Sequence, residues 1–426
     1  MLGASRACIY RMRKPSVLVI FLTVFIDLIG FGIVLPLLPM YNRDLGASGL
    51  LIGVIQASYS AMQFLFAPGW GRLSDRIGRR PVLLTSTAGA AISYGIFAYG
   101  CGLTGTTALW VLLGSRVLAG ICGANITVAQ AYIADITPAA DRSKRMGLIG
   151  MAFGLGFVFG PPLGGLGIQL LGLRGPGYLA AALCTLNFLL ALTILPESWK
   201  PSSEHVASRP HLDQFLHTLG HPKIGLLVAV FFLATFCFAS FETTLGLLIS
   251  KNLHLNAATH QDMKLSSYLI AYCGVIGAII QGGMIGRMVK RSGEARVIAN
   301  SMFLLAVSLV PLPFIRGSGA AVWVLLLLVL AVLAVASSLT RPPVFGLISI
   351  LTPANEQGAT IGVAQSAGSL ARILAPIFAA GLLDYHPALP YLICGGISLF
   401  TGFLVVHRLC GERERVADRD AATVTK

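Results

Sequence analysis

Long apolar runs separated by short polar segments dominate the pattern of this chain. Because a membrane-spanning α-helix needs about 20 consecutive apolar residues, each long run predicts one span. Twelve such runs predict an all-α membrane protein with twelve transmembrane helices. They fall near residues 16–40, 49–70, 80–103, 108–135, 144–169, 177–195, 223–250, 264–287, 295–315, 320–351, 358–383 and 388–408.

One polar segment, residues 196–222, is longer than the others and rich in Pro, Ser and His. It divides the chain into six spans and six spans. We therefore predict an N-terminal half at 1–195, a cytoplasmic linker at 196–222 and a C-terminal half at 223–410. Residues 411–426 are charged and aperiodic, which predicts a disordered cytoplasmic tail.

The composition agrees with a membrane location. Of 426 residues, 55% are hydrophobic and only 11% are charged, whereas soluble chains carry about 25% charged residues. The net charge of +14 comes from basic residues that flank the apolar runs, so we exclude nucleic acid as a partner. No phosphate-binding loop or Cys-X-X-Cys pair is present, and we expect neither an enzyme nor a cofactor or metal.

The distribution of Lys and Arg predicts the orientation. With the N-terminus inside, the inner segments hold 23 of these residues and the outer loops hold five. Both termini are then cytoplasmic. The first apolar run is too long for a signal-peptide core of roughly 7 to 15 residues, so we expect it to be retained as a helix.

A charged island interrupts the apolar pattern at residues 71–81. Five ionised side chains exclude it from hydrocarbon, which predicts a tight interfacial turn where Gly78 allows a left-handed conformation. The sequence GRLSDRIGRRPVLL resembles the loop between the second and third helices of the major facilitator superfamily, in the form found in tetracycline-type drug:proton antiporters. That resemblance implies two six-helix bundles in a pseudo-two-fold arrangement, with a site between them.

The same resemblance implies a cytoplasmic gate that holds an outward-open state, in which Asp75 contacts the facing end of the eleventh helix. By itself, such charge clustering is usually only a topology signal. The residues assigned to the gate are Gly71, Asp75, Arg76, Gly78, Arg79, Arg80, Asp135, Arg142 and Arg145.

Ionisable residues inside the spans are the candidates for proton coupling. Asp27 and Arg116 lie roughly 17 Å and 12 Å from opposite faces, near the middle of a core of about 30 Å. Such residues are costly in hydrocarbon and usually functional, and we predict an ion pair between them. The alternatives are a permanently paired structural acid and an arginine capped by backbone carbonyls. Glu242 is a second proton or cation-recognition site, or alternatively a structural partner of Arg372.

An internal duplication is predicted at an offset of 215 residues. Asp27 falls on Glu242 and Gly78 on Gly293, so GRMVKRSGEARVI is a degenerate copy of the island. Lys290 replaces Asp75 in that copy. We therefore expect any charge-pair latch to be stronger through the first copy.

Two further segments carry recognisable features. The sequence GLGFVFGPPLGG resembles the fifth-helix signature of antiporters, and its small residues permit close helix packing or seal the cavity against leak. Pro342 and Pro343 are expected to break the tenth predicted helix next to Arg341, which is either a substrate contact or a basic anchor. The fifth-helix residues are Gly156, Gly160, Pro161, Gly164 and Gly165.

The chain departs from tetracycline exporters at two places. Ser93 and Tyr94 stand where those proteins carry a third-helix acid, and the eighth predicted span has no histidine. An amphipathic cavity, suited to a hydrophobic drug or a lipid-like molecule, is expected instead. Its assigned residues are Gln56, Gln63, Tyr94, Phe236, Phe241, Gln281, Arg341 and Arg372.

These features predict a proton-coupled exporter of amphipathic small molecules in a bacterial inner membrane, functioning as a monomer within the lipid bilayer. Protons and the small-molecule substrate are its expected partners. The alternatives are a facilitator or importer of a metabolite or lipid-like substrate with the same fold, and a membrane receptor that does not transport.

Overall fold

A computed structural model describes residues 15–34, 49–123, 125–199, 211–253, 261–317 and 319–410, and within these ranges it contains helices and no strand. The α-helices are α1 (Val17–Val34), α3 (Gly49–Ile77), α4 (Arg79–Gly100), α5 (Gly105–Cys122), α6 (Asn125–Ile136), α7 (Arg142–Leu171), α8 (Gly175–Ile194), α9 (His211–Gly220), α10 (Pro222–Asn252), α11 (Gln261–Ile279), α12 (Ile285–Ser292), α13 (Glu294–Leu309), α14 (Ala320–Leu351), α15 (Gln357–Tyr385) and α16 (Leu389–Val405). Single 3₁₀ turns cover Ala139–Asp141, Gly172–Arg174, Leu312–Phe314 and Ala354–Glu356, and π-helical segments cover Ile280–Met284 and Val406–Cys410.

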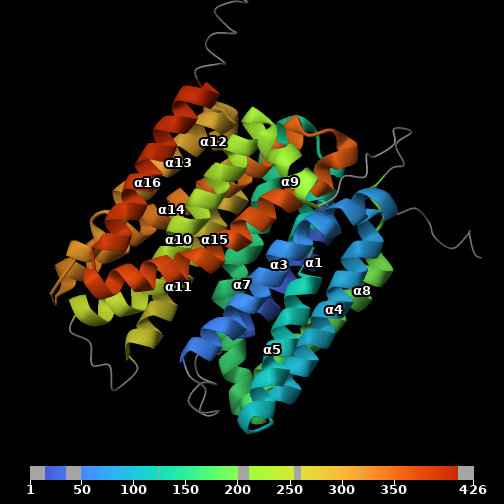
Figure 1. Ribbon diagram of the computed structural model, residues 1–426, viewed down its shortest axis with the longest axis horizontal. Helices are drawn as coiled ribbons and strands as arrows, with labels where there is room; N and C mark the ends of the chain where they lie inside the picture. Colours follow the sequence, from blue (N-terminus) through green and yellow to red (C-terminus); the bar gives the residue numbers. More distant parts are fainter. Residues whose placement is uncertain are drawn as a thin grey trace, which may run out of the picture.

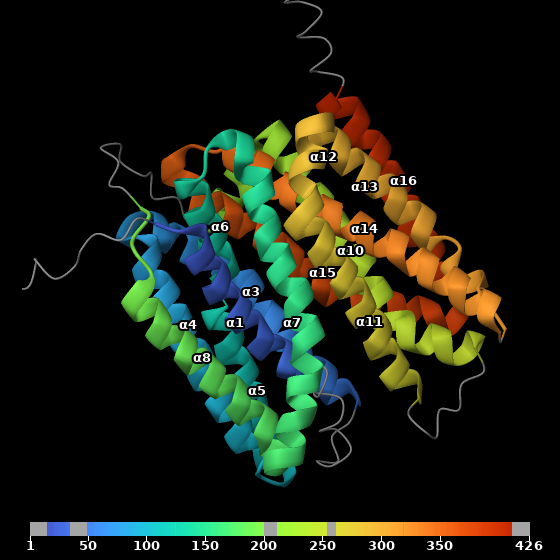
Figure 2. The same cartoon turned by 180° about the vertical axis from the view of Figure 1, so that it is seen from behind.

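The long helices run side by side in two groups. Helices α1 to α8, blue to green, lie together on one side of the molecule, and α10 to α16, yellow to red, lie on the other (Figures 1 and 2). The main contacts between the groups are made by α3 with α15, by α7 with α11 and by α7 with α14, and α6 also contacts α15. Side chains on these helices are therefore positioned to act between the groups.

Ten helical stretches within the described ranges are long and apolar enough to cross a membrane. One of them, Ala139–Ile194, is 56 residues long and contains both α7 and α8. The predicted first span extends to residue 40, but its last part lies outside the described residues. The predicted tail at 411–426 also lies outside them. The predicted linker contains helix α9, whose Phe215 packs on Phe64 of α3 with ring centroids 6.1 Å apart.

The charged island is more helical than the sequence predicts. Helix α3 continues through it to Ile77 and α4 begins at Arg79, so the expected interfacial turn consists of Gly78 alone. Its φ of 101° is a conformation that residues with a side chain rarely adopt. Asp75, Arg79 and Arg80 remain in helical geometry because the partners described below satisfy them, and Arg76 is exposed.

Backbone geometry repeats at the offset of the predicted duplication. Gly293, like Gly78, has a positive φ, at 77°, and directly precedes a helix. The 3₁₀ turns Ala139–Asp141 and Ala354–Glu356 follow prolines of nearly identical φ and ψ, −56° and 147° against −55° and 148°. The two copies therefore share their turn conformations as well as their rare residues.

Two prolines do not break α14, contrary to the prediction. Pro342 and Pro343 are buried, and the helix is continuous from Ala320 to Leu351. A proline removes only one ladder hydrogen bond, and a helix packed among neighbours tolerates that loss. Glycines do permit close packing of α7. A Cβ atom at Gly156 or Gly160 would overlap the α1 backbone, whereas Gly165 faces open space.

Candidate functional site

A buried charge cluster lies where α3 ends and α4 begins. The Arg79 guanidinium donates to Asp75 Oδ1 at 2.6 Å and to Asp135 Oδ2 at 3.0 Å, and it also donates to Ser74 Oγ at 2.7 Å. The Arg79 and Asp75 side chains are 0% and 1% exposed. Two carboxylates around one guanidinium offset the desolvation cost that each ion has in this interior position.

The Asp75 carboxylate also caps a helix from the other group. Its Oδ1 accepts from the Gly358 N–H at 3.0 Å and its Oδ2 accepts from the Ala359 N–H at 2.8 Å, both in the first turn of α15. An anion at a helix N-terminus satisfies orphan N–H groups and complements the helix dipole. A Cβ atom at Gly71 would overlap the Gly358 carbonyl, so α3 and α15 meet at backbone contact. One side chain thus ties α3 to α15.

Glu197 belongs to this cluster although the sequence analysis did not identify it. Its carboxylate accepts from the N–H groups of Arg79 at 2.9 Å and Arg80 at 3.1 Å, which are the first two residues of α4. Ser198 next to it donates to Asp135 Oδ2 at 3.0 Å. The only sequence signal is an acid directly after a span, and this signal does not reveal which helix the acid caps.

The remaining gate candidates divide into bonded and exposed residues. Arg80 donates to the Leu192 carbonyl at 2.8 Å, and Arg142 donates to the Ser349 carbonyl at 2.6 Å. Arg76 and Arg145 are exposed, and neither has an ion pair with another described residue. The bond from Arg142 is a second link between the groups, because Ser349 lies on α14.

The degenerate copy of the island makes only weak polar contacts. Lys290 lies 3.6 Å from Asp141, but these side chains are 67% and 42% exposed. Ser143 donates to Glu294 at 3.5 Å. Exposed ion pairs contribute little to stability, so the charge pairing of this copy is weaker than that of the first.

The second candidate region lies inside the spans of the N-terminal group. Cys184 Sγ donates to Asp27 Oδ1 at 3.9 Å, and the Arg116 guanidinium carbon lies 5.4 Å from the Tyr94 ring centroid and 5.0 Å from that of Phe97. Arg116 is 2% exposed. Asp27 and Arg116 both interact electrostatically with Tyr59 and Tyr94, which places all four in one neighbourhood. The direct ion pair between them stays a prediction.

A chain of hydrogen bonds leads from this neighbourhood to α15. Tyr59 Oη accepts from Gln63 Nε2 at 3.5 Å, and Gln63 Oε1 accepts from Ser369 Oγ at 2.9 Å. Gln63 Nε2 also donates to the Gly123 carbonyl at 3.3 Å. The hydrogen bonds Tyr59–Gln63–Ser369 therefore connect the surroundings of Asp27 to α15 in the other group.

The third candidate region is built around Phe153 of α7. The guanidinium carbons of Arg341 and Arg372 lie 4.7 Å and 5.8 Å from its ring centroid. Arg341 Nη2 donates to Gln365 Oε1 at 3.3 Å, and Gln365 Nε2 donates to Gln130 Oε1 of α6 at 2.8 Å. Two cations of the C-terminal group thus face one aromatic ring of the N-terminal group.

Glu242 lies near Arg372 without being bonded to it. It interacts electrostatically with Arg372, yet no ion pair within 4.0 Å joins these two described residues. Phe236 packs on Phe378 at 5.0 Å. Phe241 is buried elsewhere, beside Tyr391 and Cys394, and Gln281 packs against Gly147 and Gly150. The Gln56 side chain lies outside the description.

No group of three or more His, Cys, Asp or Glu residues in the described ranges is arranged to hold a metal ion.

Comparison with known proteins assigns the family. A sequence profile of the Major Facilitator Superfamily matches residues 20–376 and 282–424. The chain belongs to this superfamily of membrane transporters. It is 34% identical over 400 residues to the tetracycline resistance protein, class C, of Escherichia coli, a match that covers 90% of this chain and 96% of that protein.

Two other transporters are also similar to this chain. Multidrug resistance protein 2 of Bacillus subtilis is 26% identical over 392 residues, covering 91% of this chain and 93% of that one. The crystal structure of the human organic anion transporter MFSD10 superposes with a TM-score of 0.77 at 25% identity, covering 91% of this chain and 98% of the other. This member of the superfamily is therefore an integral, multi-pass membrane protein related to drug-efflux transporters.

Proposed function

We propose that this transporter exports amphipathic small molecules in exchange for protons, by alternating access between two six-helix bundles. Splitting Ala139–Ile194 into α7 and α8 and adding α3, 29 residues long, raises the ten candidate spans to twelve. The N-terminal half is residues 1–195 and the C-terminal half residues 223–410, with both termini cytoplasmic. We also propose that the protein lies in a bacterial inner membrane and functions as a monomer.

The observation that carries the proposal is the placement of Asp27 with Arg116 inside the spans, linked through Gln63 to Ser369 on α15. A carboxylate within hydrocarbon is stable when it is paired or protonated, so a change in its surroundings changes whether it holds a proton. The hydrogen-bond chain couples that change to contacts between the helix groups. Asp27 is then the proton carrier, and Arg116 tunes its proton affinity.

The charge cluster at Asp75 supplies the gate in this mechanism. When Asp75 caps α15, the cytoplasmic ends of α3 and α15 are held together and the transporter is closed to the cytoplasm. Release of these bonds allows the halves to rock and open inward. Drug resistance among the relatives supports an amphipathic substrate.

Proteoliposomes with an imposed pH gradient test this function. We expect the purified full-length chain to move rhodamine 123, an amphipathic dye, with accompanying proton flux, and we expect Asp27→Asn to abolish the coupled flux because it removes the titrating charge. Asp213→Asn, an exposed acid on α9, is the matched control and should transport normally. Equal flux with and without the gradient would favour a facilitator, and unchanged proton flux in Asp27→Asn would refute the role of this acid.

A further inference from the structure

Three ionisable side chains with unused bonding capacity lie in the C-terminal group, where Arg372 shares the Phe153 ring with Arg341 and interacts electrostatically with Glu242. Arg341 on α14 makes one side-chain hydrogen bond, to Gln365, while its buried Nε has no partner. Arg372 on α15 and Glu242 on α10 have neither an ion pair nor a hydrogen bond within the described ranges. Buried polar groups are nearly always satisfied in proteins, so the buried Arg341 Nε without a hydrogen-bond partner points to a ligand.

The two arginines are close enough to act on one ligand. Both guanidinium groups lie over the Phe153 ring, and because both are positively charged they repel each other. Like charges held together inside a membrane protein are unfavourable unless an anion lies between or beside them. This geometry favours a ligand that carries a negative group.

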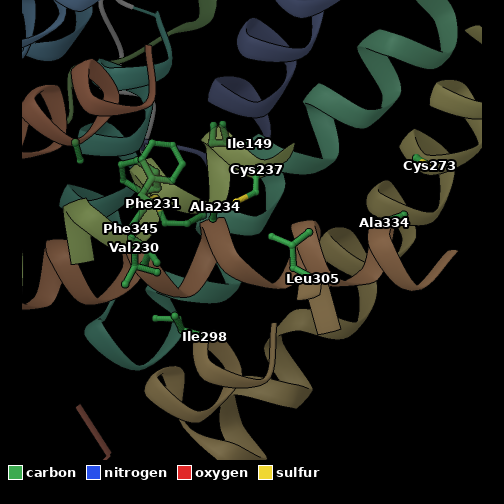
Figure 3. Packing of buried hydrophobic residues seen from close by; sticks show 14 of the residues in the cluster. Ile149, Val230, Phe231, Ala234, Cys237, Cys273, Ile298, Leu305, Ala334 and Phe345 are labelled. Carbon is green, nitrogen blue, oxygen red and sulfur yellow. The ribbon is translucent and has the colours of Figure 1, made fainter. Parts of the chain in front are cut away.

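Aromatic rings surround the Arg341 guanidinium. Arg341 also lies 5.6 Å from Phe231 and 5.8 Å from Phe345, and these two rings pack against each other at 4.9 Å, as their adjacent side chains in Figure 3 indicate. A guanidinium that lies near aromatic rings directs its N–H groups outward in its own plane. A planar carboxylate matches that edge by two parallel hydrogen bonds.

Gln365 positions Arg341 for this role. Its Oε1 accepts from the guanidinium, and its Nε2 donates to Gln130 Oε1 at 2.8 Å. Because Gln130 lies on α6, the orientation of Arg341 is set by helices of both groups. Gln365 is a positioning residue, since it acts through the arginine.

The charges at the site exclude simple anions and simple cations as the best ligands. A cation is attracted by Glu242 but repelled by two guanidinium groups, and an anion is attracted by the arginines but repelled by Glu242. A molecule that carries both poles satisfies every group. Its aromatic body would lie against Phe153, which offers ring contact worth about 0.5–1.5 kcal/mol beyond area burial.

We propose that this site binds an amphoteric aromatic molecule, with its carboxylate on the Arg341 guanidinium, its basic amine on Glu242 and its ring against Phe153. The proposal rests on the transport function proposed above and names the substrate class for it. It also assigns a second coupling step, because the amine of the substrate and a proton compete for the same Glu242 carboxylate. Substrate binding then releases a proton, as exchange requires.

Three dyes with one xanthene skeleton test the assignment. Rhodamine 110 carries a carboxylate and cationic amines, its methyl ester rhodamine 123 lacks the carboxylate, and fluorescein lacks the amines. Binding is measured by fluorescence anisotropy with the purified full-length chain in nanodiscs, without any pH gradient. We expect rhodamine 110 to bind more tightly than the other two dyes.

The variants separate the two poles. Arg341→Gln should weaken rhodamine 110 and fluorescein by about tenfold or more while rhodamine 123 changes by less than about twofold, because a charge-assisted hydrogen bond is lost only with a carboxylate ligand. Glu242→Gln should weaken rhodamine 110 and rhodamine 123 and leave fluorescein unaffected or tighter. Arg174→Gln, an exposed arginine at the start of α8, is the control and should change none of them.

Folding and binding are distinguished by two additional measurements. Size-exclusion profiles and melting temperatures report the integrity of each variant, and Arg341→Lys should restore part of the rhodamine 110 affinity by retaining the charge. An equal loss for all three dyes in Arg341→Gln, or wild-type binding of rhodamine 110 no tighter than that of rhodamine 123 and fluorescein, would overturn the proposal. Failure of proton-coupled flux with this binding pattern intact would instead overturn the transport function.

Discussion

Replacing Asp75 by Asn is expected to open the cytoplasmic gate. The wild-type carboxylate accepts three hydrogen bonds, from Arg79 at 2.6 Å, Gly358 at 3.0 Å and Ala359 at 2.8 Å, at a position only 1% exposed. An Asn amide has one acceptor oxygen, and its NH₂ group would face N–H donors. The substitution therefore removes the charge and leaves at least one buried N–H of α15 without a partner.

The magnitude follows from those contacts. Each hydrogen bond to a charged group contributes about 1.5–3 kcal/mol, and breaking a buried ion pair costs about 3–5 kcal/mol. Arg79 keeps Asp135, so part of that cost is avoided. We expect the closed state to lose about 3 kcal/mol relative to the open state, which is a factor on the order of 100 in their ratio.

Hydrogen–deuterium exchange of the first turn of α15 measures this ratio directly. The Gly358 and Ala359 N–H groups exchange when the latch opens, so their protection should fall on the order of 100-fold in Asp75→Asn. The control is Asp141→Asn, which removes the half-exposed partner of Lys290 and should lower protection by less than about fivefold. Equal protection in Asp75→Asn and the wild type would refute the latch, and equal loss in both variants would refute its asymmetry.

Two substitutions test the packing around the latch. Gly71→Ala should destabilise the contact with α15, because the new Cβ overlaps the Gly358 carbonyl, and it should reduce both the hydrogen-exchange protection of α15 and transport. Gly95→Ala is the control, because a Cβ there meets open space, and it should instead raise the melting temperature through a helix-propensity gain of up to about 1 kcal/mol. Glu197→Gln should lower the free energy of unfolding by about 1–2 kcal/mol by weakening the cap on α4, whereas Asp213→Asn, at an exposed position on α9, should not. Equal melting temperatures for Glu197→Gln and the wild type would contradict the capping role.

The sequence by itself determined the class of protein and the residues available for chemistry. Hydrocarbon requires about 20 apolar residues per span and penalises every charge within it, so membrane insertion imposes a composition that local windows reveal. For the same reason Asp27, Arg116, Glu242, Arg341 and Arg372 stood out before any contact was known. The island at residues 71–81 was equally visible, and it carried the resemblance that family membership later confirmed.

Only the tertiary structure decided which of these residues meet. The bonds from Asp75 to the first turn of α15 join positions 283 and 284 residues apart, and the stacking of Arg341 on Phe153 joins two different helix groups. Such contacts depend on how each helix is rotated and tilted against its neighbours, which apolar content does not specify. Packing likewise kept α14 continuous through Pro342 and Pro343, where a local rule predicted a break, and placed Glu197 on α4 as a cap.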